Sequence, residues 1–251
     1  MSGHSHWATI RRKKGAADAK RGQVFTRLAR EIVIAAREGG GDPSSNVRLQ
    51  YAIDRARAQN MPKDNIERAI KRGTGDSKEG NALEEVHYEG YGPHGVAFII
   101  SCVTDNRNRA VSEIRHILSR FGGSMAEAGS VAWQFRKSAY FSLPAEGQDV
   151  DKIFEMAVDA GADDVVVDDD TIEIFAPVES FKAISDKLKE AKIQPEEAEL
   201  RMFPNNEMEL PVEDALQVLK VVDALEELDD VQDVYSTLKL TDEVLAQLEM
   251  A

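Results

Sequence analysis

The sequence predicts an α+β protein in which an N-terminal three-helix domain is followed by two α/β sandwich domains. Apolar residues recur at helical spacing from residue 18 to residue 72. Beyond residue 82 they gather into short runs typical of strands, which alternate with helical segments. Residues 139–203 follow a β-α-β-β-α-β order, the ferredoxin-like pattern. Further strands and helices come after it, so we expect the last domain to be a ferredoxin-like unit inserted into the middle domain.

The N-terminal domain is expected to contain helices over residues 18–37, 46–59 and 62–72. Gly39-Gly40-Gly41-Asp42-Pro43 ends the first helix, since glycine permits a left-handed cap and proline cannot continue a helix. Ser44 or Ser45 can cap the second helix. Pro62 suits the first turn of the third helix, and Gly73 is expected to end it.

The middle domain begins with strands over 85–91 and 96–103, which Gly92-Pro93-His94-Gly95 joins as a tight turn. A helix over 108–121 and a strand over 131–135 follow. After residue 205 the chain supplies further elements of the same domain. These are a short strand over 208–210, a helix over 213–227, a strand over 231–235 and a last amphipathic helix over 242–249.

The inserted unit is expected to contain two helices, over 149–160 and 178–191, and four strands, over 140–143, 164–167, 171–175 and 198–203. The glycine-rich stretch 73–81 reads as a flexible linker. The expected domains are therefore residues 1–75, residues 82–136 together with 206–251, and residues 137–205.

Charge divides the chain into two unequal parts. Residues 1–75 hold 16 Lys and Arg against 7 Asp and Glu, whereas residues 76–251 hold 15 against 38. An acidic protein ordinarily repels nucleic acid, but here a basic module occupies one end of an acidic chain. This asymmetry favours a polyanion-binding surface within residues 1–75.

The candidate nucleic-acid-binding residues are the cations of the N-terminal region with two histidines and a tryptophan near them: His4, His6, Trp7, Arg11, Arg12, Lys13, Lys14, Lys20, Arg21, Arg27, Arg30, Arg37, Arg48 and Arg55. Closely spaced cations release counterions from phosphates, and an indole ring can stack on an unpaired base or seat the arm. The bland alternative is a merely solvated helix surface. Contacts to phosphates carry no sequence information, so the pattern does not separate DNA from RNA.

A second candidate anion site comprises Arg107 and Arg109, within the run from Asp105 to Arg109 at the start of a helix. Asp105 or Asn106 is a sensible helix cap, which is the structural interpretation. Two arginines at a helix N-terminus oppose the helix dipole, a cost that a bound anion would offset. Both interpretations stay open at the level of sequence.

The chain lacks the motifs of the commoner enzymes and metal sites. It has no Walker A sequence and no dinucleotide-binding fingerprint, and its only cysteine, Cys102, lies in an apolar run as a buried residue would. His4 and His6 could ligate a metal, but a phosphate contact suits a basic arm better. Asp168-Asp169-Asp170 could bind a cation, although a turn between strands explains it more simply. We expect no enzyme activity, no cofactor and no metal.

No apolar run reaches the roughly 18 residues that a membrane helix needs, and the N-terminus does not resemble a secretory leader. We expect a cytoplasmic protein that makes no membrane contact.

Several segments closely resemble the YebC family from residue 3 to about residue 245: Gly3-His4-Ser5-His6-Trp7-Ala8-Thr9-Ile10, Asp18-Ala19-Lys20-Arg21-Gly22, Gly39-Gly40-Gly41-Asp42-Pro43, Asn60-Met61-Pro62, Tyr88-Glu89-Gly90-Tyr91-Gly92-Pro93, Asp105-Asn106-Arg107-Asn108-Arg109 and Gly129-Ser130-Val131-Ala132. His6 stands where many members have lysine. The resemblance implies a helical domain followed by two α/β domains. It also implies a regulatory role, because members are described as transcriptional regulators and relatives act as translational activators, including in mitochondria.

The expected function is therefore non-enzymatic regulation of gene expression by a nucleic-acid-binding protein. Two targets remain open: DNA, as for a transcriptional regulator, and ribosomal RNA or tRNA, as for a ribosome-associated translation factor. The oligomeric state remains open too.

Overall fold

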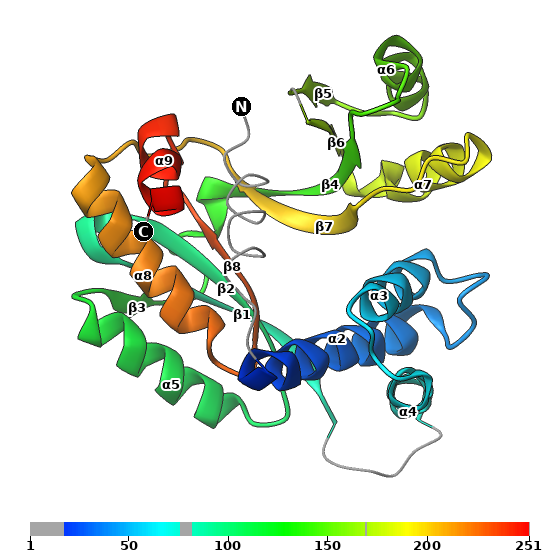
Figure 1. Ribbon diagram of the computed structural model, residues 1–251. Helices are drawn as coiled ribbons and strands as arrows, with labels where there is room; N and C mark the ends of the chain where they lie inside the picture. The colour runs from blue at the N-terminus through cyan, green and yellow to red at the C-terminus, as the bar shows by residue number, and fades with distance from the viewer. Residues whose placement is uncertain (1–17, 76–81, 169, 251) are drawn as a thin grey trace. The chain divides into compact units, whose positions relative to one another are not determined.

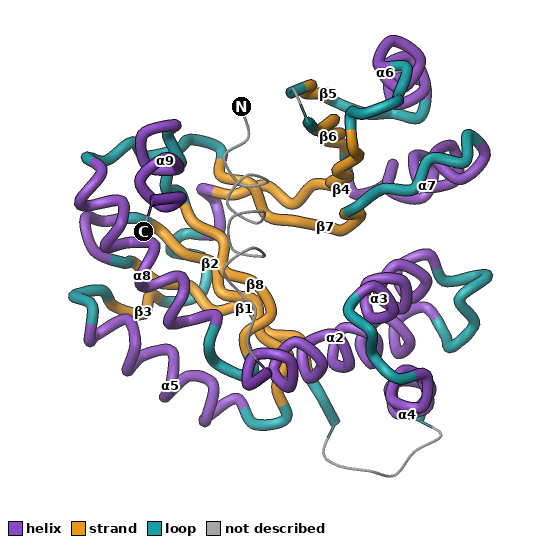
Figure 2. The backbone as a smooth tube through the Cα atoms, viewed as in Figure 1, coloured by secondary structure: helices purple, strands orange, loops and turns teal. Residues whose placement is uncertain are grey.

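The computed structural model describes residues 18–75, 82–168 and 170–250 and confirms the predicted fold class. Three N-terminal helices precede two four-stranded antiparallel sheets, each of which carries helices (Figures 1 and 2). The described chain divides into two compact units. The first unit comprises the residues on either side of 135–205, and the second unit comprises residues 135–205. The expected boundaries of three domains stay a prediction.

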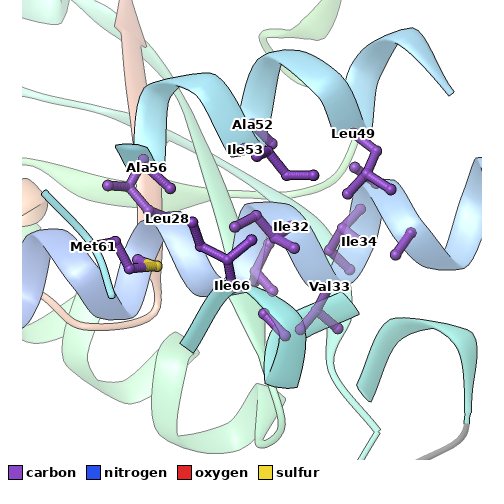
Figure 3. Close-up of a cluster of buried hydrophobic side chains, with 14 of the residues drawn as sticks. Leu28, Ile32, Val33, Ile34, Leu49, Ala52, Ile53, Ala56, Met61 and Ile66 are labelled. Atoms are coloured by element: carbon purple, nitrogen blue, oxygen red, sulfur yellow. The ribbon is translucent and has the colours of Figure 1, made fainter. Parts of the chain in front are cut away.

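The N-terminal helices are α2 (Asp18–Gly39), α3 (Val47–Ala58) and α4 (Lys63–Thr74), close to the expected ranges. Their apolar faces form one core around Ile32, Leu49 and Ile66 (Figure 3). Leu83 and Val103 belong to the same core, although they lie beyond the linker. The helices are therefore packed onto the start of the middle domain, not only onto each other.

Two helix ends differ from the sequence prediction. Asn46, not Ser44 or Ser45, caps α3, because its side chain accepts a hydrogen bond from the backbone N–H of Leu49 at 3.0 Å. The helix α4 ends at Gly75, in the left-handed conformation, and not at Gly73. Gly73 is buried inside α4, where an added Cβ would lie 2.5 Å from the carbonyl oxygen of Val33. That glycine therefore allows close packing of α4 on α2, which local pattern does not reveal.

The sheet of the middle domain has the order β3-β1-β2-β8, and all its neighbouring strands are antiparallel. Its strands are β1 (Glu84–Tyr91), β2 (Ala97–Thr104), β3 (Ser124–Ala126) and β8 (Val231–Ser236). The helices of this domain are α5 (Arg107–Arg120), α8 (Val212–Glu226) and α9 (Asp242–Met250). The first two lie along the sheet (Figure 1). Ile114 and Leu118 of α5 and Val218 of α8 belong to the core that they share with it. Because β8 pairs with β2, residues from both sides of the second unit build this sheet.

Three predictions for the middle domain need correction. The segment expected as a strand over 131–135 is a 3₁₀ turn, Ala132–Gln134, and the strand begins only at Phe135. The short strand expected over 208–210 is a single bridge between Met208 and Leu238. The strand β3 was not predicted, because three residues at a sheet edge are too few to show a period.

The second unit has the expected βαββαβ order and the sheet order β5-β6-β4-β7. Its elements are β4 (Phe135–Pro144), α6 (Val150–Asp159), β5 (Asp164–Val167), β6 (Thr171–Ala176), α7 (Phe181–Glu190) and β7 (Glu197–Pro204). Interlocking order of this kind, with the first and third strands central, is the split βαβ arrangement. On one face Tyr140 is fully buried and donates a hydrogen bond to Glu173 at 2.5 Å.

Candidate nucleic-acid interface

Half of the predicted nucleic-acid-binding residues fall outside what the structure describes. His4, His6, Trp7, Arg11, Arg12, Lys13 and Lys14 lie outside the described residues. Lys20 and Arg21 are described only as backbone at the start of α2. The assignment of these residues to phosphate contacts stays a prediction.

The arginines of α2 that the structure describes face the protein itself. Arg30 forms an ion pair with Asp230 at 2.9 Å and also donates to the backbone carbonyl of Asp229. Arg37 donates to the carbonyl of Leu83, and Arg27 is half-buried. Gln23, on the same helix, donates to the carbonyl of Glu227 at 2.6 Å. These contacts join α2 to the middle domain.

The arginines of α3 also have carboxylate partners within the chain. Arg48 pairs with Glu38 and, at 3.6 Å, with Glu85, while Arg55 pairs with Glu31 at 3.1 Å. Burial by itself would lower the pKa of Arg48, but the neighbouring Glu38 and Glu85 carboxylates raise it overall. A phosphate that approached these arginines would have to compete with the carboxylates already in place.

Two cations of α4 that are not among the candidate residues named from sequence are more accessible. Arg68 and Lys71 are exposed, and neither forms an ion pair with any residue in the described part of the chain. They lie three positions apart and therefore on neighbouring points of one helix face. The buried residues Ile66 and Ala69 occupy the opposite side of α4. Their spacing against this apolar stripe could have identified both cations from sequence.

The second candidate anion site contains carboxylates of the protein. Arg107 pairs with Glu84, and Arg109 pairs with Asp230 at 2.7 Å and Asp105 at 3.0 Å. Asn106 caps α5 by accepting from the backbone N–H of Arg109 at 3.1 Å, which confirms the structural interpretation of this segment. The hydrogen bonds that Arg109 donates to Asp230 and then to Asp105 raise the pKa of Arg109. Whether these arginines also bind an anion stays a prediction.

Asp230 is the point where these distant arginines meet. Its side chain is 2% exposed and accepts from Arg30 on α2, Arg109 on α5 and the Thr104 hydroxyl at the end of β2. A buried carboxylate needs such compensation, because removal from water costs several kcal/mol if the charge is left unpaired. Local sequence patterns cannot predict this cluster, since Asp230 lies more than 120 residues from each of its three partners.

An exposed aromatic ring is the other surface feature that the sequence analysis missed. Trp133 is 71% exposed, and its indole N–H donates to the carbonyl of Ser130 at 2.9 Å. The carboxylate of Glu89 accepts from the backbone N–H groups of Gly129, Val131 and Ala132 at 2.6, 2.6 and 3.0 Å. These N–H groups are therefore unavailable for strand pairing, which explains why the expected strand is a turn. The same bonds hold the ring on a fixed loop.

The remaining residues singled out by the sequence are the cysteine, the three aspartates between two strands and the two N-terminal histidines. Cys102 is buried, as expected, and burial, with a smaller contribution from Asp230, raises the pKa of its thiol to about 12. Within the described residues no group of three or more His, Cys, Asp or Glu side chains could hold a metal ion. Asp168 and Asp170 flank the turn between β5 and β6, where the N–H of Asp168 donates to Thr171 at 2.8 Å. His4 and His6 are not described.

Comparison with family models identifies the family of this chain. The N-terminal domain of the TACO1/YebC protein matches residues 5–76, and the TACO1/YebC second and third domains match residues 83–238. The chain belongs to the TACO1/YebC family. This confirms the resemblance seen in the sequence motifs.

Relatives of this TACO1/YebC protein carry regulatory names. A protein of Nitrosococcus oceani named "Probable transcriptional regulatory protein" is 53% identical over 249 residues, which cover 99% of this chain and 100% of that protein. One of the same name from Chlorobaculum parvum is 50% identical over 250 residues, or 99% of each chain. The crystal structure of a conserved hypothetical protein from Aquifex aeolicus is 40% identical, with a TM-score of 0.81 over 91% of this chain and 94% of that one.

These comparisons support a regulator of the YebC type at the level of the family. The relatives are named as regulatory proteins and not as enzymes. None of the helices in the described ranges combines the length and apolarity needed to cross a bilayer.

Proposed function

We propose that this protein is a non-enzymatic, cytoplasmic regulator of gene expression that binds nucleic acid through its basic N-terminal region. The observation that carries the proposal is the separation of charge, with 16 cations against 7 carboxylates in residues 1–75 and the reverse excess beyond them. A polyanion would be attracted to one end of this chain and repelled by most of the rest. Membership of the TACO1/YebC family, whose relatives carry regulatory names, supports the same role.

The structure refines which cations the proposal needs. Arg30, Arg37, Arg48 and Arg55 contact carboxylates or carbonyls of the protein itself. The binding surface therefore consists mainly of Arg68 and Lys71 on α4 together with the basic run Arg11-Arg12-Lys13-Lys14. Such cations contribute affinity that depends on salt and not on base sequence.

The relatives' name makes duplex DNA the first candidate target. A protein that reads DNA sequence usually places one helix in the major groove and presents Arg, Asn or Gln side chains to base edges. Such a helix should have a row of polar side chains that do not bind elsewhere in the protein.

RNA of the ribosome, or tRNA, is the second candidate, and the arginine contacts favour it. The arginines of α3 pair with carboxylates of the chain instead of forming an open row: Arg48 with Glu38 and Glu85, Arg55 with Glu31, and Arg57 with Asp54. Scattered exposed cations on an otherwise acidic protein suit the irregular phosphate surface of a folded RNA better than they suit a single groove of duplex DNA. The exposed ring of Trp133 adds a surface on which an unpaired base could stack.

A competition experiment separates the two targets. The full-length protein is mixed, at one near-physiological salt concentration, with ribosomes and with duplex DNA that carries promoter sequence. Co-sedimentation with ribosomes and equal, weak binding to promoter and scrambled duplex would support the RNA target. Strong preference for one promoter without ribosome binding would overturn it and support the DNA target. The absence of binding to both ribosomes and duplex DNA would contradict the whole proposal.

Replacement of Arg11, Arg12, Lys13 and Lys14 by alanine tests the surface itself. We expect the log–log salt slope of binding to fall by roughly 0.7–0.9 for each phosphate that is no longer neutralised. A charge-matched control replaces four exposed lysines elsewhere by alanine: Lys182, Lys189, Lys192 and Lys220. Deletion of residues 1–75 is a poorer test, because it would expose Leu83 and Val103 and remove Arg30 from Asp230. An equal effect of both sets of substitutions would contradict the assignment.

A further inference from the structure

The described chain exposes four large hydrophobic side chains, and three of them lie in one short segment of the second unit. Phe154 and Val158 of α6 are 50% and 49% exposed, and Val167 at the end of β5 is 46% exposed. Single exposed apolar residues are ordinary on protein surfaces, but a group of them indicates a binding surface. We call the segment Asp149–Asp170 the α6–β5 corner.

The helix α6 presents its two exposed apolar residues on one side. Phe154 and Val158 are four positions apart, so at about 100° per residue they lie within about 40° of each other around the helix. The core-facing residues Ile153 and Ala157 occupy the neighbouring side, buried at 2% and 0% exposure. The apolar surface of α6 thus extends outward beyond the part that the sheet covers.

Val167 adds to this surface from the neighbouring edge strand. The strand β5 lies at the edge of its sheet and contacts α6 (Figure 1). Val167 pairs in register with Ile172, which is fully buried. Directly paired residues of antiparallel strands share a face of the sheet, so Val167 continues a core face to the solvent at the edge. An edge strand with an exposed valine beside an apolar helix face is suited to a protein ligand.

The charge around these residues decides which ligand fits. Between Asp149 and Asp170 the sequence has nine carboxylates and one lysine. Asp151 and Glu155 are exposed on the same side of α6 as Val158. Nucleic acid and anionic lipid would be repelled, and a second copy of the same corner would bring carboxylates together. A cationic apolar segment would gain both apolar burial and charge complementarity.

We propose that the α6–β5 corner is a docking surface for a lysine- or arginine-rich amphipathic helix of a partner protein. Apolar side chains of that helix cover Phe154, Val158 and Val167, and its cations face Asp151 and Glu155. This inference goes beyond the proposed function and does not rest on it, because the surface is in the second unit and repels the polyanion that the N-terminal region attracts.

The test uses the full-length protein and a fluorescein-labelled amphipathic helical peptide of lysine and leucine, at about 150 mM salt, where distant charges are screened. A peptide of glutamate and leucine with the same pattern is the charge control. We expect addition of the protein to raise the fluorescence anisotropy of the lysine peptide and not that of the glutamate peptide. The double variant F154S/V158S should weaken its binding about tenfold or more, because it removes two apolar side chains that the peptide would bury. Unchanged urea midpoints would show that the variants remain folded.

Two matched variants exclude general electrostatic attraction. We expect D151K/E155K to lower the affinity for the lysine peptide about tenfold. The variant D242K/E243K changes the net charge of the protein by the same amount on α9, and we expect it to have little effect on that affinity. Trp133→Ser controls for loss of an exposed apolar residue elsewhere. Equal weakening by both charge reversals, or undiminished binding to F154S/V158S, would overturn the proposal. Concentration-dependent dimerisation that F154S/V158S abolishes would also overturn it, in favour of a second copy.

Discussion

Arg30 and Arg68 belong to one basic stretch of sequence, yet the fold uses them in different ways. Arg30, with a side chain 14% exposed, is bound to the buried carboxylate of Asp230, which lies 200 residues further along the chain. Arg68 is exposed and forms no ion pair within the described residues. The comparison teaches that a count of cations overstates the charge available to a ligand. Arginines that join α2 to the middle domain stabilise the fold, and the exposed cations of α4 remain for binding.

Removal of the Asp230 carboxylate should have the largest effect on stability. Asp230→Ala leaves Arg30 and Arg109 without their shared partner, and we expect a loss of about 3–5 kcal/mol in the free energy of unfolding. Urea unfolding followed by circular dichroism measures it. Asp229→Ala is the matched control, since the exposed Asp229 loses the same charge but keeps the carbonyl that Arg30 uses. Similar small losses for both variants would contradict a structural role for Asp230.

The thiol of Cys102 gives a second measurement of the same junction. Cys102 is buried within electrostatic reach of Asp230 and Arg30, and its raised pKa of about 12 leaves almost no thiolate at neutral pH. Labelling by a thiol reagent should be slow in the native protein and faster in Asp230→Ala. Equally slow labelling in a destabilised variant would mean that the core around Cys102, which α5 and α8 cover, does not open when this carboxylate is lost.

Glu89→Gln should have an intermediate effect, because it weakens the hydrogen bonds that join one loop to β1 and leaves the core intact. We expect a loss of about 1–2 kcal/mol in unfolding free energy at neutral pH. Burial alone would raise the pKa of Glu89, but the N–H groups of Gly129, Val131 and Ala132 outweigh it and lower the pKa below its ordinary 4.5. The unfolded chain therefore binds the proton more tightly, and acid favours unfolding.

The pH dependence of this variant follows from that sign. The stabilisation by ionised Glu89 is complete above the unfolded pKa of 4.5 and is lost as the pH falls through the lower folded pKa. The difference in the free energy of unfolding between the wild-type protein and Glu89→Gln should thus become smaller as the pH falls from neutral to about 3. Glu127→Gln, on the same loop, is the control. A difference that stays constant over this range would contradict the role of the ionised carboxylate.

Arg68→Ala with Lys71→Ala should have the smallest effect on stability, within about 0.5 kcal/mol, because both side chains are exposed. Nucleic-acid affinity should fall, and the log–log salt slope should fall by roughly 0.7–0.9 for each phosphate that these cations neutralise. The control pair, Lys182→Ala with Lys189→Ala, removes equal charge from the second unit. Unchanged affinity would remove α4 from the interface and leave Arg11-Arg12-Lys13-Lys14 as the main binding segment.

The sequence predicted most of the fold because its elements are set by local period. The apolar residues of α2, α5 and α8 recur at helical spacing, and the βαββαβ order of residues 135–204 is visible from alternating patterns and turns. The errors lie where a distant residue intervenes. The strand expected over 131–135 became a turn because Glu89, on β1, binds its backbone N–H groups. The end of α4 moved beyond Gly73 because that glycine packs against α2.

The candidate interface could be predicted only in part. Its location in the basic region follows from composition, but the choice among cations does not. Arg48 has no carboxylate within five positions in the sequence, whereas Arg68 follows Asp64 and Glu67. Only the fold places Glu38 and Glu85 beside Arg48. The assignment of Arg27, Arg30, Arg37 and Arg55 to phosphates therefore remains a prediction.

The sequence by itself determined the α+β class, the order of the elements, the separation of charge and the family to which the chain belongs. These properties depend on residues close together in the chain, where helical and strand periods and turn residues act directly. Tertiary structure decided which arginines are engaged, which carboxylate is buried, and which apolar residues of α6 stay exposed. Those outcomes depend on contacts between residues tens to hundreds of positions apart, whose burial and charge compensation appear only when the chain has folded.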